Sequence, residues 1–138
     1  MINNVYDLIK RHEGRRLKPY KCPAGKLTIG YGRNLDANGI THDEAEAMLT
    51  HDVVTTVNAV KKYNFYEGLS DVRKAVVVDM AYNLGLGGLR SFVKFRKHLT
   101  HRDYLSAARE MMDSKWATQV PNRAKRLAAM MRTNKWPT

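Results

Sequence analysis

Apolar positions in the first dozen residues recur at helical spacing. Three of them lie three and four positions apart and so share one helix face: Val5, Leu8 and Ile9. Asn3 or Asn4 can cap this helix, and we expect it to run to His12. Gly14 supplies the stop, because glycine adopts the left-handed conformation after a helix without a steric penalty.

A strand-like run lies within a segment of short strands and turns at 15–35. Residues 26–32, Lys-Leu-Thr-Ile-Gly-Tyr-Gly, combine β-branched and aromatic residues with glycines, which is typical of a short strand. Gly30 and Gly32 lie two positions apart, so we expect them to share one strand face and to leave it bare. A bare face of this kind indicates that something approaches the backbone closely.

A turn and a capping box open the next helix. Residues 35–40 are expected to form a turn in which Asp36 bonds to its own backbone. Thr41 and Glu44 form a capping box, in which each side chain accepts from the other residue's backbone N–H. The helix should span about 42–62, roughly 30 Å at 1.5 Å per residue, which is long enough to connect two lobes. Its apolar stripe consists of Ala45, Met48, Leu49, Val53, Val57 and Val60.

Helical patterns fill the rest of the chain. Ser70 caps a helix at 71–84, whose apolar residues cover almost every face, and Gly85 breaks it. Further amphipathic helices are expected at about 89–99, 102–113 and 121–132. Because one small sheet follows the first helix of an otherwise helical chain, the sequence predicts an α+β fold.

Composition narrows the class of protein. The 138 residues are enough for one domain with a core, and no apolar run approaches the roughly 20 residues of a bilayer span. Charged residues such as Asp7 and Lys10 interrupt any secretory signal. The net charge of +11 indicates an anionic partner, for which nucleic acid and a bacterial envelope are equally suitable. His98 and His101 lack further ligands at metal-binding spacing, so we expect no metal and no other cofactor.

Candidate chemistry lies between Glu13 and Thr28. Glu13 ends the first helix, where the helix dipole disfavours an ionised carboxylate, and this suits a group that must donate a proton. The alternative is a solvated residue in the last helical turn. Cys22 follows in a turn, and Thr28 places a hydroxyl on the expected strand. Because Cys22 is the only cysteine, no intrachain disulfide can form, and the alternative for this thiol is a small buried apolar residue.

These residues resemble the phage-type lysozymes, the endolysins of glycoside hydrolase family 24. The family pattern has a glutamate, eight residues, an aspartate or cysteine, five residues, and a threonine in Thr-Ile-Gly-x-Gly, which Glu13, Cys22 and Thr28 match. A second block at 116–126 resembles the family's C-terminal Pro-Asn-Arg-Ala-x-Arg segment. The resemblance implies a single catalytic domain over 1–138 with two lobes around a cleft. The lobes would be a small β-containing one at about 13–55 and a helical one from 1–12 and about 60–138, joined by the helix at about 42–62.

The resemblance also implies an activity without a cofactor. A muramidase of this family hydrolyses the β-1,4 bond between N-acetylmuramic acid and N-acetylglucosamine in peptidoglycan, with inversion, to lyse the host cell. Glu13 would be the general acid, Cys22 and Thr28 would position or activate the water, and Arg123 would support Glu13 by favouring its charged form. Tyr82 matches the family's cleft-facing aromatic residue and would stack on a sugar, although a core tyrosine is equally consistent.

Cys22 departs from the two-carboxylate pattern, and its role stays open. It can position the water beside Thr28, act as a thiolate base, or attack the sugar to form a thioglycosyl intermediate with retention. Asp36 is an alternative second carboxylate. The resemblance further implies a structural ion pair between Arg33 and Asp52.

Partners and location follow from the same resemblance. We expect a monomer that waits in the host cytoplasm until a separate membrane-permeabilising protein releases it to the wall. Anionic envelope lipids are a further candidate partner, because residues 123–132 form a cationic, amphipathic helix. An ordinary packed last helix explains that pattern too. The competing function is a non-catalytic basic module that binds nucleic acid or the anionic envelope.

Overall fold

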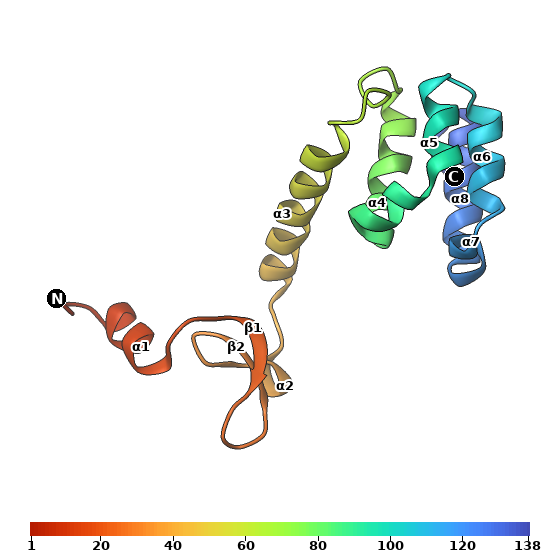
Figure 1. The fold of residues 1–138 in the computed structure, drawn as a ribbon. Coiled ribbons are helices and arrows are strands. Elements are labelled where there is room, and N and C mark those ends of the chain that lie inside the picture. Colours follow the sequence, from red (N-terminus) through yellow and green to blue (C-terminus); the bar gives the residue numbers. More distant parts are fainter. The chain divides into compact units, whose positions relative to one another are not determined.

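The computed structural model describes residues 1–138, which form two compact units, Met1–Met48 and Leu49–Thr138 (Figure 1). Helix α3 (His42–Val60) runs across the division. The chain is mostly helical with one small antiparallel sheet after the first helix, so the predicted α+β class is confirmed. The assignment of residues 1–12 to the helical lobe stays a prediction.

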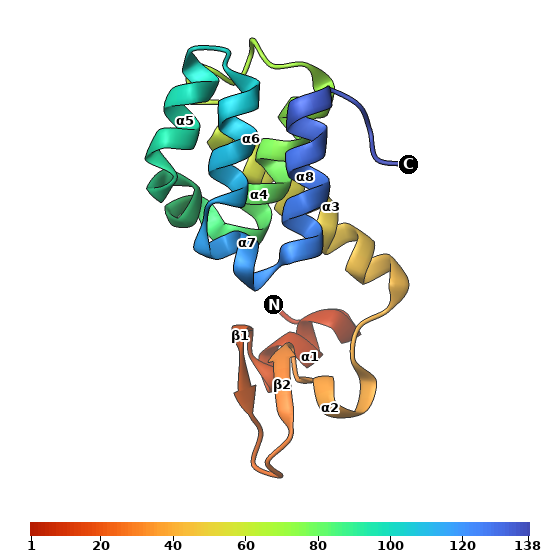
Figure 2. The ribbon, with the colours of Figure 1, turned by 90° about the vertical axis from the view of Figure 1, so that its right-hand side faces the viewer.

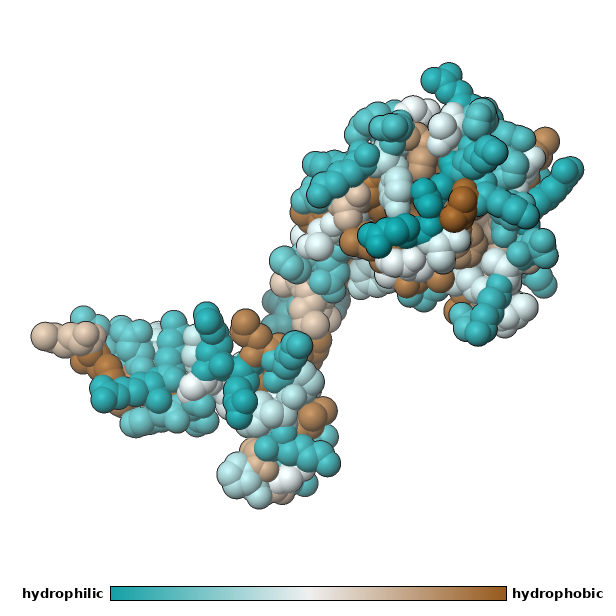
Figure 3. Space-filling model, in the orientation of Figure 1, coloured by the Kyte–Doolittle hydropathy of each residue, from teal (hydrophilic) through white to brown (hydrophobic).

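Helix α1 (Val5–Glu13) begins and ends where its capping residues predict. The side chain of Asn4 accepts from the backbone N–H of Asp7 at 2.9 Å, which confirms one of the two expected caps. Gly14 follows with a φ of 72°, and the helix includes Glu13, one residue beyond the expected end. No residue of α1 is buried, so its apolar stripe stays exposed, as the brown atoms along α1 in Figure 3 show.

The sheet contains three strands in sequential order: β1 (Arg16–Lys21), β2 (Leu27–Gly30) and β3 (Arg33–Asn34). Tyr20 pairs with Thr28, which pairs in turn with Asn34. The expected strand was too long, because Gly30 and Gly32 take φ values of 70° and 79° and turn the chain back into β3. The two glycines therefore belong to a tight turn rather than to one bare strand face.

The predicted turn at 35–40 is instead one helical turn, α2 (Leu35–Asn38), capped by the side chain of Asn34. Asp36 does not bond to its own backbone. Its Oδ2 accepts from the backbone N–H of Leu27 at 2.7 Å, which ties α2 to the start of β2. Asp36 thus has a structural contact that its sequence neighbours do not reveal.

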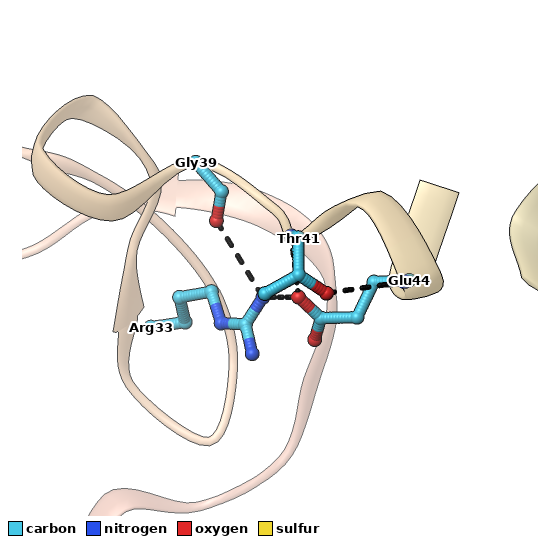
Figure 4. A network of polar contacts seen from close by, with 4 residues as sticks. All are labelled: Arg33, Gly39, Thr41 and Glu44. Atoms are coloured by element: carbon cyan, nitrogen blue, oxygen red, sulfur yellow. Dashed lines mark hydrogen bonds and ion pairs between the residues drawn. The ribbon is translucent and has the colours of Figure 1, made fainter. Parts of the chain in front are cut away.

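The capping box at the start of α3 is confirmed, and it also binds an arginine (Figure 4). The Glu44 amide donates to the Thr41 hydroxyl at 3.1 Å, and the Thr41 amide donates to Glu44 Oε1 at 2.8 Å. The same oxygen accepts from Arg33 Nη1 at 2.5 Å. Glu44 therefore joins the end of the sheet to the first turn of α3. Asp52 belongs to the other unit, and its expected pairing with Arg33 stays a prediction.

This network makes the first unit sensitive to acid. The Arg33 guanidinium, followed by the Thr41 amide, lowers the pKa of Glu44 from 4.5 to about 2. A lowered pKa in the folded state stabilises the fold above the unfolded value, and this contribution is lost as the pH falls from about 4.5 towards 2. We expect Glu44→Gln to unfold more readily than wild type at neutral pH, and the difference to shrink below pH 4.5. Thermal melts followed by circular dichroism across that pH range measure the difference in stability between the two proteins. A difference that does not change with pH contradicts the prediction.

The helical unit contains five further helices: α4 (Asp71–Ser91), α5 (Val93–Thr100), α6 (Tyr104–Met112), α7 (Lys115–Gln119) and α8 (Pro121–Thr133). Helix α4 packs against α8. Helix α6 lies between α5 and α8 (Figure 2). Ser70 caps α4 by accepting from the Arg73 amide at 3.2 Å, as predicted. Gly85, with a φ of 78°, interrupts α4, but helical structure resumes to Ser91. The short helix α7 was not expected.

The core of this unit explains why its helices hold together. Its largest fully buried side chains come from all the long helices and are Phe95, Met80, Leu89, Leu99, Met111, Met131, Val60, Val76 and Val77. Burial of each such side chain stabilises the fold by roughly 1.5–3 kcal/mol. Of the predicted α3 stripe, only Val60 is buried. No helix is both long and apolar enough to cross a bilayer.

Candidate functional site

Glu13 lies against the glycine turn that follows β2. A Cβ atom built on Gly32 would lie 2.8 Å from Cδ of the Glu13 side chain, closer than real Cβ contacts come. The sequence indicated that something approaches this backbone, and at Gly32 that group is the Glu13 carboxylate itself. Gly30, by contrast, has no atom within 4 Å of a built Cβ. A side chain at position 32 would require the Glu13 carboxylate, which lies beside the sheet at the end of a flexible side chain, or the turn itself to move.

Cys22 and Thr28 lie together at the hairpin between β1 and β2. The Cys22 amide donates to the Lys26 carbonyl at 2.9 Å, and the Gly25 amide donates to the Cys22 carbonyl at 2.8 Å, which closes the turn. Thr28 is buried, and its hydroxyl donates to the Lys26 carbonyl at 2.8 Å. Since this bond occupies the hydroxyl proton, the oxygen is left to accept from a water rather than to donate to it.

The hairpin also favours ionisation of the thiol. The Lys26 main chain has the largest effect and, together with the Ala24 main chain, lowers the pKa of Cys22, against an opposing effect of burial. Hydrogen bonds to a thiolate stabilise the charged form. The half-buried Cys22 is therefore ionised in a larger fraction of molecules than an ordinary thiol, and all three of its possible roles stay open.

Two other predicted site residues, Arg123 and Tyr82, line one hollow in the helical unit. Arg123 lies in the first turn of α8, and its Nε donates to Asp79 Oδ1 on α4 at 2.7 Å. Tyr82 lies one turn after Asp79 on α4 and is 43% exposed, so it is not a core tyrosine. Asp79 was missed from the sequence because it lies 44 residues from its partner and matches no local motif.

The predicted residues thus form three local groups: Glu13 with Gly32, Cys22 with Thr28, and Arg123 with Tyr82. The first two groups belong to the unit Met1–Met48, and the third belongs to Leu49–Thr138. The three groups present, respectively, a carboxylate, a thiol beside a buried hydroxyl, and a cation beside an exposed aromatic ring.

A model of the phage lysozyme family matches residues 10–135, which include all of these groups. The chain belongs to the phage lysozyme family. It is 26% identical to the probable T4-type lysozyme 1 of Dictyostelium discoideum over 163 aligned positions, which cover 96% of each chain. It is 34% identical to an endolysin of Acyrthosiphon pisum secondary endosymbiont phage 1 over 118 positions, covering 83% of this chain and 78% of the relative.

A longer phage protein matches in the same way. The endolysin of Bacillus phage B103 is 35% identical over 116 positions, which cover 80% of this chain and 43% of that protein. This phage lysozyme is therefore a hydrolase of the class that degrades bacterial cell walls. The family assignment inferred from Glu13, Cys22, Thr28 and the C-terminal block is confirmed.

Proposed function

We propose that this phage lysozyme is a muramidase that hydrolyses the β-1,4 bond between N-acetylmuramic acid and N-acetylglucosamine in peptidoglycan. The observation that carries the proposal is the Glu13 carboxylate seated on Gly32, in the same unit as Cys22 and Thr28. A bulkier residue at position 32 would displace this carboxylate. A general acid has to be held in one place to protonate a leaving oxygen, and the glycine turn supports that requirement.

In this mechanism, Glu13 donates its proton to the glycosidic oxygen while a water attacks the anomeric carbon from the opposite face. Cys22 and Thr28 position that water, Thr28 by accepting from it. The lowered pKa of Cys22 supports a second contribution, in which the thiolate removes a proton from the water. Tyr82 stacks on a sugar ring. Arg123 pairs with Asp79 in its own unit, and its support of Glu13 stays a prediction.

The sugar found at each newly formed reducing end shows which bond of peptidoglycan is cleaved. Purified, nucleic-acid-free peptidoglycan is digested, the new reducing ends are reduced with borohydride, and the products are analysed by mass spectrometry. A muramidase yields reduced muramic acid at the new ends, whereas a glucosaminidase yields reduced glucosamine. Reduced glucosamine, or no new ends at all, would overturn the assignment of the bond.

Location follows from the same activity. We propose that the protein stays in the host cytoplasm, away from its substrate, until a membrane-permeabilising protein admits it to the wall. The net charge of +11 then favours attraction to an anionic envelope. Expression in bacteria with and without such a permeabilising protein tests this, with culture lysis expected only when both are present.

Cys22→Asp is expected to keep substantial activity, within about tenfold of wild type, because a carboxylate also positions and activates water. If the thiolate acts as the base, the activity of the wild type rises over the pH range in which Cys22 ionises. In Cys22→Asp the same rise should occur at lower pH, where a carboxyl group ionises. The rate of wall lysis across pH measures the shift. NMR of the first product anomer, in both proteins, separates inversion from a thioglycosyl route with retention.

A further inference from the structure

One peptide group in the hairpin contacts both of the residues that are proposed to position the water. It joins Lys26 to Leu27, so the Lys26 carbonyl and the Leu27 N–H lie in one rigid plane. The carbonyl accepts from the Cys22 amide at 2.9 Å and from the Thr28 hydroxyl at 2.8 Å. Turning this plane would therefore move its carbonyl away from Cys22 and Thr28 together.

Asp36 holds the opposite end of the same plane. Its Oδ2 accepts from the Leu27 N–H at 2.7 Å. Helix α2, which carries Asp36, lies beside β2 (Figure 2), and its capping residue Asn34 pairs with Thr28 in the sheet. A charged acceptor forms a stronger hydrogen bond than a neutral one, and it also polarises the amide so that the carbonyl at the other end accepts more strongly.

We propose that Asp36 is a positioning residue, which holds the Leu27 N–H and thereby directs the Lys26 carbonyl at the Cys22 amide and the Thr28 hydroxyl. This inference rests on the proposed function, which gives Cys22 and Thr28 their role in the reaction. The Thr28 oxygen is left to accept from a water only while its proton points to the Lys26 carbonyl. In this role Asp36 acts through a peptide group and not as a second catalytic carboxylate.

The two roles of Asp36 place opposite demands on its charge. A catalytic carboxylate has to be ionised, whereas a residue that holds an N–H needs only an oxygen acceptor, which an asparagine amide also supplies. Asp36→Asn should therefore keep the maximal rate of wall lysis within about threefold of wild type, while Asp36→Ala should lose about tenfold. The amount of peptidoglycan that gives half the maximal rate should change less than about twofold in either variant, because no proposed contact with the polymer is removed.

The thiol provides a second measurement that does not depend on catalysis. The Lys26 main chain has the largest effect in lowering the pKa of Cys22. Loosening this main chain in Asp36→Ala should therefore raise the pKa of the thiol towards its ordinary value. The Cys22 Cβ signal, followed by NMR across pH, measures the ionisation. We expect it to occur at higher pH in Asp36→Ala and at nearly the wild-type pH in Asp36→Asn.

Asp43→Ala is the matched control. Asp43 is another exposed carboxylate of the same unit, in the first turn of α3, so its removal should change neither the rate nor the Cys22 titration. Thermal melts show whether each variant is folded. Asp36→Leu, which has nearly the shape of asparagine but no acceptor, replaces Asp36→Ala if that protein unfolds.

The outcomes separate this inference from the proposed function. A wild-type rate, or a wild-type Cys22 titration, in Asp36→Ala overturns the inference. Equal losses of activity in Asp36→Asn and Asp36→Ala also overturn it, because that result assigns a catalytic charge to Asp36. If Glu13→Gln lyses walls like wild type, the catalytic assignment fails instead, and the Cys22 titrations still report whether Asp36 positions the hairpin.

Discussion

Glu13→Gln is expected to abolish wall lysis almost completely, with a loss of roughly 10²- to 10⁴-fold or more in rate. A carboxamide keeps the shape of the side chain but has no proton to donate to the leaving oxygen. The carboxylate is exposed and lies against Gly32, so the substitution should leave the fold intact. The measurement is the loss of turbidity of purified, nucleic-acid-free peptidoglycan, with thermal melts to show that the variant is folded.

Glu67→Gln serves as the control for this experiment. Glu67 is 75% exposed and pairs with Lys74 in the helical unit, so removing its charge should leave the rate near wild type. Equal turbidity loss by wild type and Glu13→Gln, or no loss by either, contradicts the proposal that the protein is a muramidase with Glu13 as its acid. Either result favours the basic binding module. In that case, retention on DNA at rising salt tests the nucleic-acid alternative.

Gly32→Ala is expected to have the second-largest effect. The new Cβ would lie 2.8 Å from Glu13 Cδ, so either the carboxylate or the turn has to move. A displacement of about 1 Å in a catalytic group can cost on the order of 10²-fold in rate. The left-handed backbone adds a strain of about 1–2 kcal/mol, since φ at this residue is 79°. We expect the rate of wall lysis to fall about 10²-fold with a modest drop in melting temperature.

Gly30→Ala separates strain from displacement. Gly30 has a φ of 70°, so alanine suffers a similar backbone penalty there, but no atom lies within 4 Å of its built Cβ. The two variants should therefore lose similar stability, while Gly32→Ala loses far more activity. Equal activity losses in the pair would mean that the contact between Glu13 and Gly32 has no role in the reaction.

Local signals in the sequence predicted much of the fold. Caps were identified correctly at Asn4, Thr41 and Ser70, because a side chain that bonds to a backbone N–H a few residues away needs no tertiary context. The strand end was misplaced because glycine allows both a bare strand and a tight turn, and only the observed φ values at Gly30 and Gly32 distinguish them.

The candidate site was less predictable. Spacing identified Glu13, Cys22 and Thr28 through a family resemblance, but it gave no sign that the Thr28 hydroxyl donates to the Lys26 carbonyl. Asp79 was not singled out at all, because its contact with Arg123 depends on how α4 packs against α8. Long-range side-chain pairs of this kind arise from tertiary packing, about which the local pattern carries little information.

The hairpin thiol gives this protein a chemical vulnerability. Cys22 is the only sulfhydryl group in the chain, and its lowered pKa increases the thiolate fraction, the form that alkylating reagents and peroxides attack. One molecule of iodoacetamide should therefore label each chain once, beside the proposed water site. Mild peroxide should reduce the rate of wall lysis until a reducing agent is added, and Cys22→Asp should lose both the alkylation and this reversible inhibition.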